Sequence, residues 1–67
     1  MNKNKLKAKI VEHGDTKRDL ADALNIALSG LSLRINGKVD FRQDEILAIK
    51  KRYGLSSGEV DSIFFTD

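Results

Sequence analysis

Residue types that carry catalysis or bind metals are sparse in this chain of 67 residues. Cysteine is absent, and His13, the single histidine, has no second metal-binding side chain near it. Two carboxylate pairs are present, Asp19 with Asp22 and Asp44 with Glu45. Both lie beside basic residues on amphipathic segments, as solvated helix faces do. Without a second histidine, a nucleophile elbow or a phosphate-binding glycine loop, we expect no enzyme activity, no catalytic residues, no metal and no cofactor.

Basic side chains gather near the start of the chain. The net charge is +2, but residues 1–18 carry six lysines and arginines against Glu12 and Asp15, which gives +4. Residues 19–38 are balanced, and the remainder sums to −2. Two interpretations of this asymmetry stay open: a basic surface that faces an anionic partner, and a solvated helix face.

Length and composition indicate one small domain, residues 1–67. Hydrophobic residues make up 40% of the chain and charged residues 33%, with no long block of like charge. Apolar runs are short, so we expect no membrane-spanning segment and no membrane partner. The lysine-rich start lacks the apolar core of a secretory signal. With no disulfide, helix packing must hold the domain together, and we expect a cytoplasmic location.

Hydrophobic periodicity predicts an all-α chain of five short helices. Proline is absent, so the glycines at 14, 30, 37, 54 and 58 are the main signals for turns and helix ends. We expect helices at 4–13, between Thr16 and Asn25, at about 28–35, at roughly 42–52, and after Ser56. Helices this short, joined by short loops, must pack as a compact orthogonal cluster.

Capping signals support these boundaries. Thr16 with Asp19 resembles a capping box, and Ser56 with Glu59 forms another. Asn25 tolerates the left-handed backbone of a tight turn. Leu6, Ile10 and Val11 form the apolar stripe of the first helix. The residues predicted to point inward are Leu6, Ile10, Leu20, Leu24, Ile26, Leu31, Ile35, Phe41, Ile46, Ile49, Leu55, Val60 and Ile63, and Phe41 can also pack back on the fourth helix as a staple.

The segment from Thr16 to Gly37 carries a specific pattern. Its apolar positions are Leu20, Ala21, Leu24, Ile26, Leu31 and Ile35, with Asn25 at the reversal between the second and third helices. This pattern resembles the helix-turn-helix of phage repressor and Cro-type proteins, in which a small residue at the position of Ala21 lets the helices cross closely. Phe41, residues 50–55 and residues 63–65 extend the resemblance to small regulators from phages of low-GC Gram-positive bacteria. It implies a compact five-helix lambda-repressor-like domain.

The resemblance also implies a binding site for double-stranded DNA. Its base-contacting candidates, on the third helix, are Leu28, Ser29, Ser32, Leu33 and Arg34. Its phosphate-contacting candidates are Thr16, Lys17, Arg18, Asn36 and Lys38. Leu28 has a second interpretation as a core residue, because it shares a stripe with Leu31 and Ile35.

Two departures from the family pattern fall on the third helix. Ala27 stands where the family usually has a Ser or Thr N-cap, and Gly30 lies inside the helix. Each change costs about 1 kcal/mol of helix stability. The bidentate base readers of the family are also missing from the first exposed positions.

Two hypotheses of function follow. The first is a Cro-type transcriptional regulator, or repressor, that reads an operator in the major groove with residues of about 28–35. The alternative is an antirepressor-like modulator that binds a partner repressor protein through the same scaffold. For the regulator, we expect a weak homodimer, because one helix reads too few base pairs to bind an operator tightly. Ile63, Phe64 and Phe65 are the candidates for this contact, because three adjacent apolar residues cannot all face one small core.

Overall fold

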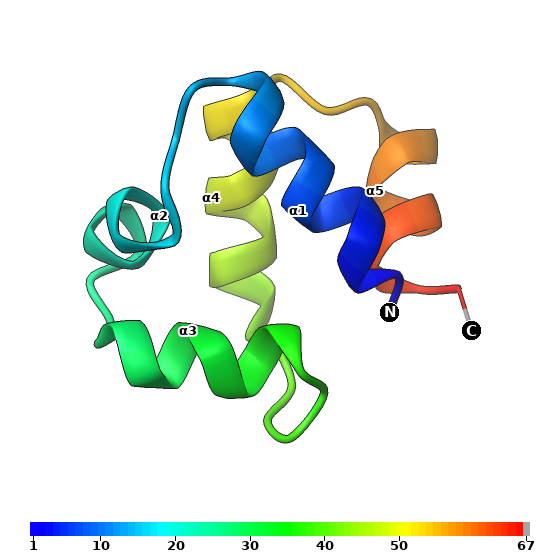
Figure 1. The fold of residues 1–67 in the computed structure, drawn as a ribbon. Coiled ribbons are helices and arrows are strands. Elements are labelled where there is room, and N and C mark those ends of the chain that lie inside the picture. Colours follow the sequence, from blue (N-terminus) through cyan, green and yellow to red (C-terminus); the bar gives the residue numbers. More distant parts are fainter. Residues whose placement is uncertain (67) are drawn as a thin grey trace.

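The computed structural model describes residues 1–66, which contain five α-helices and no strand (Figure 1). They are α1 (Lys3–Glu12), α2 (Lys17–Leu24), α3 (Leu28–Ile35), α4 (Gln43–Tyr53) and α5 (Ser57–Phe64). The predicted all-α class and the five helices are confirmed, with boundaries displaced by about one residue in α1 and α4. The longest of these helices, α4, has 11 residues, so none is long and apolar enough to cross a membrane.

Local hydrogen bonds explain where α2 and α5 begin. Thr16 Oγ1 accepts from the Asp19 amide at 3.1 Å, and an Asp19 carboxylate oxygen accepts from the Thr16 amide at 2.8 Å. Ser56 and Glu59 repeat the arrangement at 3.1 and 3.0 Å. Both predicted capping boxes are therefore confirmed, and each satisfies amide groups that a helix start leaves without a partner.

The turn between α2 and α3 is tight because Asn25 takes the left-handed conformation, with φ 58° and ψ 43°. The Asn25 amide donates to the Asp22 carbonyl at 3.1 Å, and the Ile26 amide donates to the Ala21 carbonyl at 3.0 Å. Asparagine adopts this backbone more readily than other side chains with a Cβ. The predicted reversal at Asn25 is confirmed, and it directs α3 across the end of α2.

Helix α4 runs through the middle of the molecule (Figure 1). The pair α2 and α3 lies on one side of it, α1 and α5 pack together on the other, and α3 lies across the end where α4 begins. The Asn2 amide donates to the Ile63 carbonyl at 2.7 Å and ties the start of α1 to α5. One end of the cluster is therefore formed largely by α3 and the loop that follows it.

The core follows the predicted stripes. The buried apolar residues are Leu6, Ile10, Leu20, Ala21, Leu31, Ile35, Ile49, Tyr53, Leu55, Val60 and Ile63. Four of the predicted inward residues, Leu24, Ile26, Phe41 and Ile46, are partly buried against this cluster. The prediction for Val11 is wrong, because this side chain is 75% exposed. Val11 follows Ile10 by one position, about 100° around the helix, so the narrow face that α1 buries takes Leu6 and Ile10 but not Val11.

The predicted apolar end of the chain divides between core and surface. Ile63 is buried, whereas Phe65 is 66% exposed. Phe64 is partly buried, and its ring meets Phe41 edge to face, with centroids 5.4 Å apart. Phe41 thus joins the loop after α3 to α5. The expectation that Ile63 is available for self-association is wrong, because Ile63 belongs to the core.

Candidate nucleic-acid interface

Helix α3 buries one face and presents the other to solvent. Leu31 and Ile35 are buried, and the opposite stripe carries Ser29, Leu33 and Asn36 at spacings of four and three residues. All three are exposed, and Leu33 is 46% exposed. The structure therefore brings three of the predicted DNA-contacting residues onto one helix face.

Two other predicted base-contacting residues of α3, Leu28 and Ser32, lie outside this stripe. Leu28 is 36% exposed and is not part of the buried core, so its interpretation as a core residue is not supported. Ser32 is half-buried. Neither of these side chains belongs to the stripe of Ser29, Leu33 and Asn36.

Arg34 does not lie on the exposed face, and this expectation from the sequence is wrong. Its side chain is only 15% exposed. The guanidinium folds back along α3, donating from Nε to Glu45 Oε1 at 3.0 Å and from Nη1 to the Gly30 carbonyl at 3.0 Å. In this arrangement Arg34 connects α3 to α4.

Glu45 makes the arrangement with Arg34 possible, and it is buried at 6% exposure. Its Oε1 atom accepts from Arg34 and also from the Arg42 amide, at 2.8 Å, where α4 begins. The expectation that Glu45 lies on a solvated face is therefore wrong. A buried carboxylate needs such partners, because an unpaired charge in this position would strongly destabilise the fold.

Gly30 gains a structural explanation from the same contact. A Cβ atom added at Gly30 would lie 3.2 Å from Arg34 Nη1, closer than most contacts of a Cβ. The missing side chain thus leaves room for the Arg34 guanidinium over the α3 backbone. Ala27, by contrast, takes the N-cap position of α3 without a side-chain hydrogen bond. This observation agrees with the sequence, which offered no capping group there.

The predicted phosphate-binding residues lie at the start of α2 and just beyond the end of α3. Lys17 and Arg18 are exposed in the first turn of α2 and form no ion pair within residues 1–66. Thr16 is exposed, but its hydroxyl oxygen already accepts from Asp19. Asn36 and Lys38 are exposed at the other end of α3, and the Lys38 amide is held by the Leu33 carbonyl at 2.9 Å.

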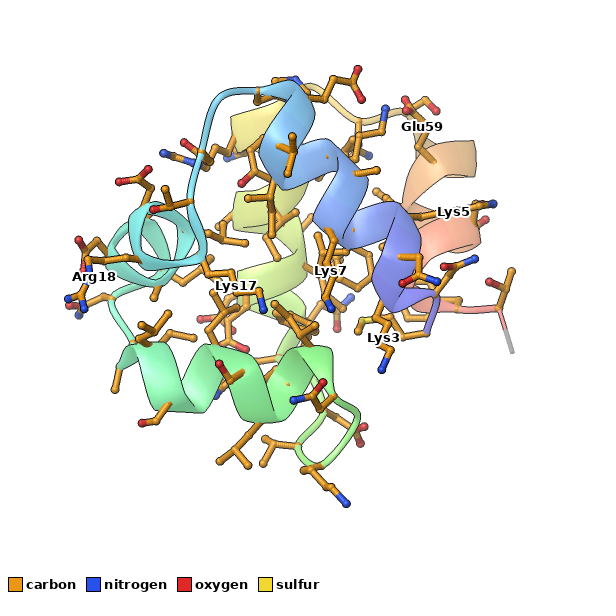
Figure 2. The ribbon with its side chains drawn as sticks, viewed as in Figure 1. Lys3, Lys5, Lys7, Lys17, Arg18 and Glu59 are labelled. Atoms are coloured by element: carbon orange, nitrogen blue, oxygen red, sulfur yellow. The ribbon has the colours of Figure 1, made fainter. Side chains whose placement is uncertain are left out.

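The lysines of α1 fall into two groups. Lys9 pairs with Glu59 at 2.8 Å and with Glu12 at 3.5 Å, and Lys5 donates to the Ser62 hydroxyl. Lys3 and Lys7 form no ion pair in the described part of the chain, and Figure 2 shows them, with Lys17, on the half of the molecule nearer to α3. Lys3 and Lys7 were missed as binding candidates, although their four-residue spacing on the first helix was a signal for a shared face.

Two carboxylates that offset basic residues lie away from α3. The hydrogen bond from Lys9 lowers the pKa of Glu59 to about 2, and Figure 2 shows Glu59 at the opposite end of the molecule from α3. Asp15 accepts from Arg52 at 2.7 and 2.9 Å and from the Tyr53 hydroxyl at 2.7 Å, and the Arg52 hydrogen bonds lower the pKa of Asp15. Among residues 1–66, the cations without an ion pair include Lys3, Lys7 and Lys17 on the half of the molecule nearer to α3, and Lys50 and Lys51 in the last turn of α4.

His13 lies at the end of α1, as expected. Its Nδ1 atom is 3.0 Å from the Lys9 carbonyl, and its ring lies against Tyr53 with centroids 4.8 Å apart. No group of three metal-binding side chains occurs within residues 1–66. These contacts account for His13 as a helix-end residue.

Comparison with known families gives one match. Residues 2–67 match the family model described as a protein of unknown function, DUF739. The chain belongs to this family. Neither the curated proteins nor the solved structures gave a match. Because the DUF739 description names no ligand, the functional inference depends on the face of α3 and the charges around it.

Proposed function

We propose that this chain is a sequence-specific DNA-binding regulator of the Cro and repressor type, with a lambda-repressor-like arrangement of its five helices. In this proposal α2, the turn at Asn25 and α3 form a helix-turn-helix. Helix α3 enters the major groove with its Ser29, Leu33 and Asn36 stripe toward the bases. The first turn of α2 and the loop after α3 contact the flanking phosphates.

One observation carries the proposal: cations that form no ion pair within residues 1–66 stand on the segments just before and just after the exposed stripe of α3. Lys17 and Arg18 stand at the start of α2, and Lys38 stands after the end of α3. A helix N-terminus also attracts phosphate, so the start of α2 adds its own partial positive charge to that of Lys17 and Arg18. This combination matches a helix that must fit between two phosphate backbones.

A single helix reads few base pairs, so operator binding by this chain needs two copies. We propose that the exposed Phe65, together with the partly buried Phe64, supplies a weak contact between copies bound to neighbouring half-sites. Two half-sites would then lie about 10 base pairs apart, which is one turn of DNA. Sedimentation of the wild-type chain and of Phe65→Ser, with and without the operator, tests this contact.

A second candidate function has its own supporting observation. Three apolar residues on or just after α3 are exposed, with Leu28 at 36%, Leu33 at 46% and Val39 at 40% exposure. An apolar surface of this kind also suits a protein partner, such as a repressor that the chain would inhibit. The cations at the start of α2 and after the end of α3 favour DNA over this alternative.

Selection from random duplexes with the purified chain, at near-physiological salt, tests the proposed function. We expect enrichment of one short motif, occurring as an inverted repeat. Failure to prefer any duplex over a nonspecific competitor would contradict DNA binding. Binding of a repressor protein by the same purified chain, lost on substitution of Leu33, would then support the antirepressor function.

A further inference from the structure

We infer that α3 identifies its DNA site mainly through the C5-methyl group of thymine, which it contacts with Leu33. This inference rests on the proposed function and names the base chemistry that the proposed interface would read. It also assigns different roles to the neighbouring residues Leu33 and Arg34, which the sequence alone placed in one set.

Leu33 is the main apolar group at the centre of the exposed stripe. It stands between Ser29 and Asn36, and 46% of it is open to solvent. Its carbonyl accepts from the Lys38 amide at 2.9 Å and from the Val39 amide at 3.3 Å. The loop after α3 is thus tied to the backbone of Leu33, so the side chain projects from a fixed position.

The charged donor that could compete with Leu33 for base contact is held elsewhere. Arg34 donates from Nε to Glu45 and from Nη1 to the Gly30 carbonyl, and its side chain is 15% exposed. Bidentate recognition of guanine by arginine is therefore not offered by α3 in this structure. The remaining polar groups of the stripe are one hydroxyl, of Ser29, and one amide, of Asn36.

The major groove contains one apolar group, the methyl group of thymine. A leucine held at the centre of a helix face gains most free energy there by covering that methyl, because the groups that distinguish the other bases in the groove are hydrogen-bond donors and acceptors. Lys17 at the start of α2 and Lys38 after the end of α3 form no ion pair in the described residues 1–66, and these cations draw the helix toward phosphates and thus toward the groove. Charge complementarity thus favours DNA as the occupant of this face.

The test replaces each thymine of the selected duplex by deoxyuridine, one at a time, which removes only the methyl group. We expect one position per half-site at which the wild-type chain binds about fourfold more weakly, as for loss of one buried methyl group. The Leu33→Ala variant should bind the unmodified duplex more weakly and should no longer respond to deoxyuridine at that position. Leu47→Ala on α4, where Leu47 is 51% exposed, is the matched control and should keep the wild-type response.

The outcomes separate the two levels of the proposal. A selected duplex can bind specifically while deoxyuridine, at every position, weakens binding equally for the wild-type chain and for Leu33→Ala. In that case recognition of the thymine methyl by Leu33 is wrong, and DNA binding stands. If Leu47→Ala removes the response equally, the assignment to Leu33 is also wrong. If no duplex is preferred, the proposed function fails, and the inference fails with it. Because Leu33 is exposed, its replacement should leave the fold intact, which the thermal unfolding of each variant checks.

Discussion

Arg34 on α3 and Glu45 on α4 form an ion pair with 3.0 Å between Nε and Oε1, and the two side chains are 15% and 6% exposed. The pair connects the proposed recognition helix to the central helix of the fold. Since Glu45 Oε1 also accepts from the Arg42 amide, one carboxylate sets both the start of α4 and the position of α3. We interpret Arg34 as a positioning residue that holds the α3 face in place.

The first prediction concerns the stability of this pair. Arg34→Met should lower the free energy of unfolding by about 3 kcal/mol, because it leaves the Glu45 carboxylate buried without its charged partner. Adding Glu45→Gln, which retains an acceptor for the Arg42 amide, should recover about 1–3 kcal/mol relative to additive single changes. Urea unfolding of the two single variants and the double variant measures this coupling. Strict additivity would show that the two residues do not act together.

The second prediction concerns Gly30. Alanine is more stable than glycine within a helix by about 1 kcal/mol, so Gly30→Ala should stabilise α3 if the added methyl group fits. In the wild-type chain the methyl group would meet Arg34 Nη1 at 3.2 Å, and the gain should be reduced or lost. In an Arg34→Met background, where no guanidinium is present, the gain of about 1 kcal/mol should appear in thermal unfolding. Equal gains in the two backgrounds would contradict the explanation given for Gly30.

The third prediction concerns acid. In the folded chain the pKa of Glu59 is about 2, below its ordinary value of 4.5, because the carboxylate accepts from Lys9. The unfolded chain therefore takes up this proton first, and the stability from the pair is present above about pH 4.5 and is lost as the pH falls toward 2. The lowered pKa of Asp15, next to Arg52, acts in the same direction.

Single substitutions measure how much the Glu59 carboxylate contributes to the loss of stability in acid. Glu59→Gln keeps the capping box with Ser56 and should reduce the loss of stability between pH 4.5 and 2. Asp61→Asn, on the same helix but in no ion pair within residues 1–66, is the control. Added salt should weaken the effect, because the Lys9 and Glu59 side chains are 24% and 42% exposed. An unchanged acid transition in Glu59→Gln would contradict the role of this pair.

Local signals in the sequence were sufficient to predict the helices and their ends. The capping boxes at Thr16 and Ser56 and the reversal at Asn25 depend on residues within three or four positions of one another. The apolar stripes likewise predicted Leu20, Leu31 and Ile35 as core residues. These features follow from helix geometry and side-chain chemistry, which a single sequence records.

Features that depend on packing between helices were not predictable in the same way. The spacing of Arg34 is compatible with an outward face, and the direction that its flexible side chain takes is decided by Glu45, eleven positions away in the sequence. The same packing buries Ile63 while leaving Phe65 exposed, and it excludes Val11 from the core. For the site, the sequence therefore placed Ser29 and Leu33 on the exposed face of α3, assigned Asn36 to phosphate rather than to this face, and misplaced Arg34.

The salt dependence of duplex binding tests most directly whether the charged surroundings of α3 meet DNA. For the duplex obtained by selection, the logarithm of the binding constant should fall linearly with the logarithm of the salt concentration, and Lys17→Gln should reduce that slope by about one unit while leaving sequence preference unchanged. Lys51→Gln is the matched control, since Lys51 is exposed near the end of α4 that lies away from α3 (Figure 1), and it should leave the slope unchanged. Two results would contradict binding of DNA at this face: slopes of both variants equal to the wild-type slope, or a larger reduction of the slope in Lys51→Gln than in Lys17→Gln.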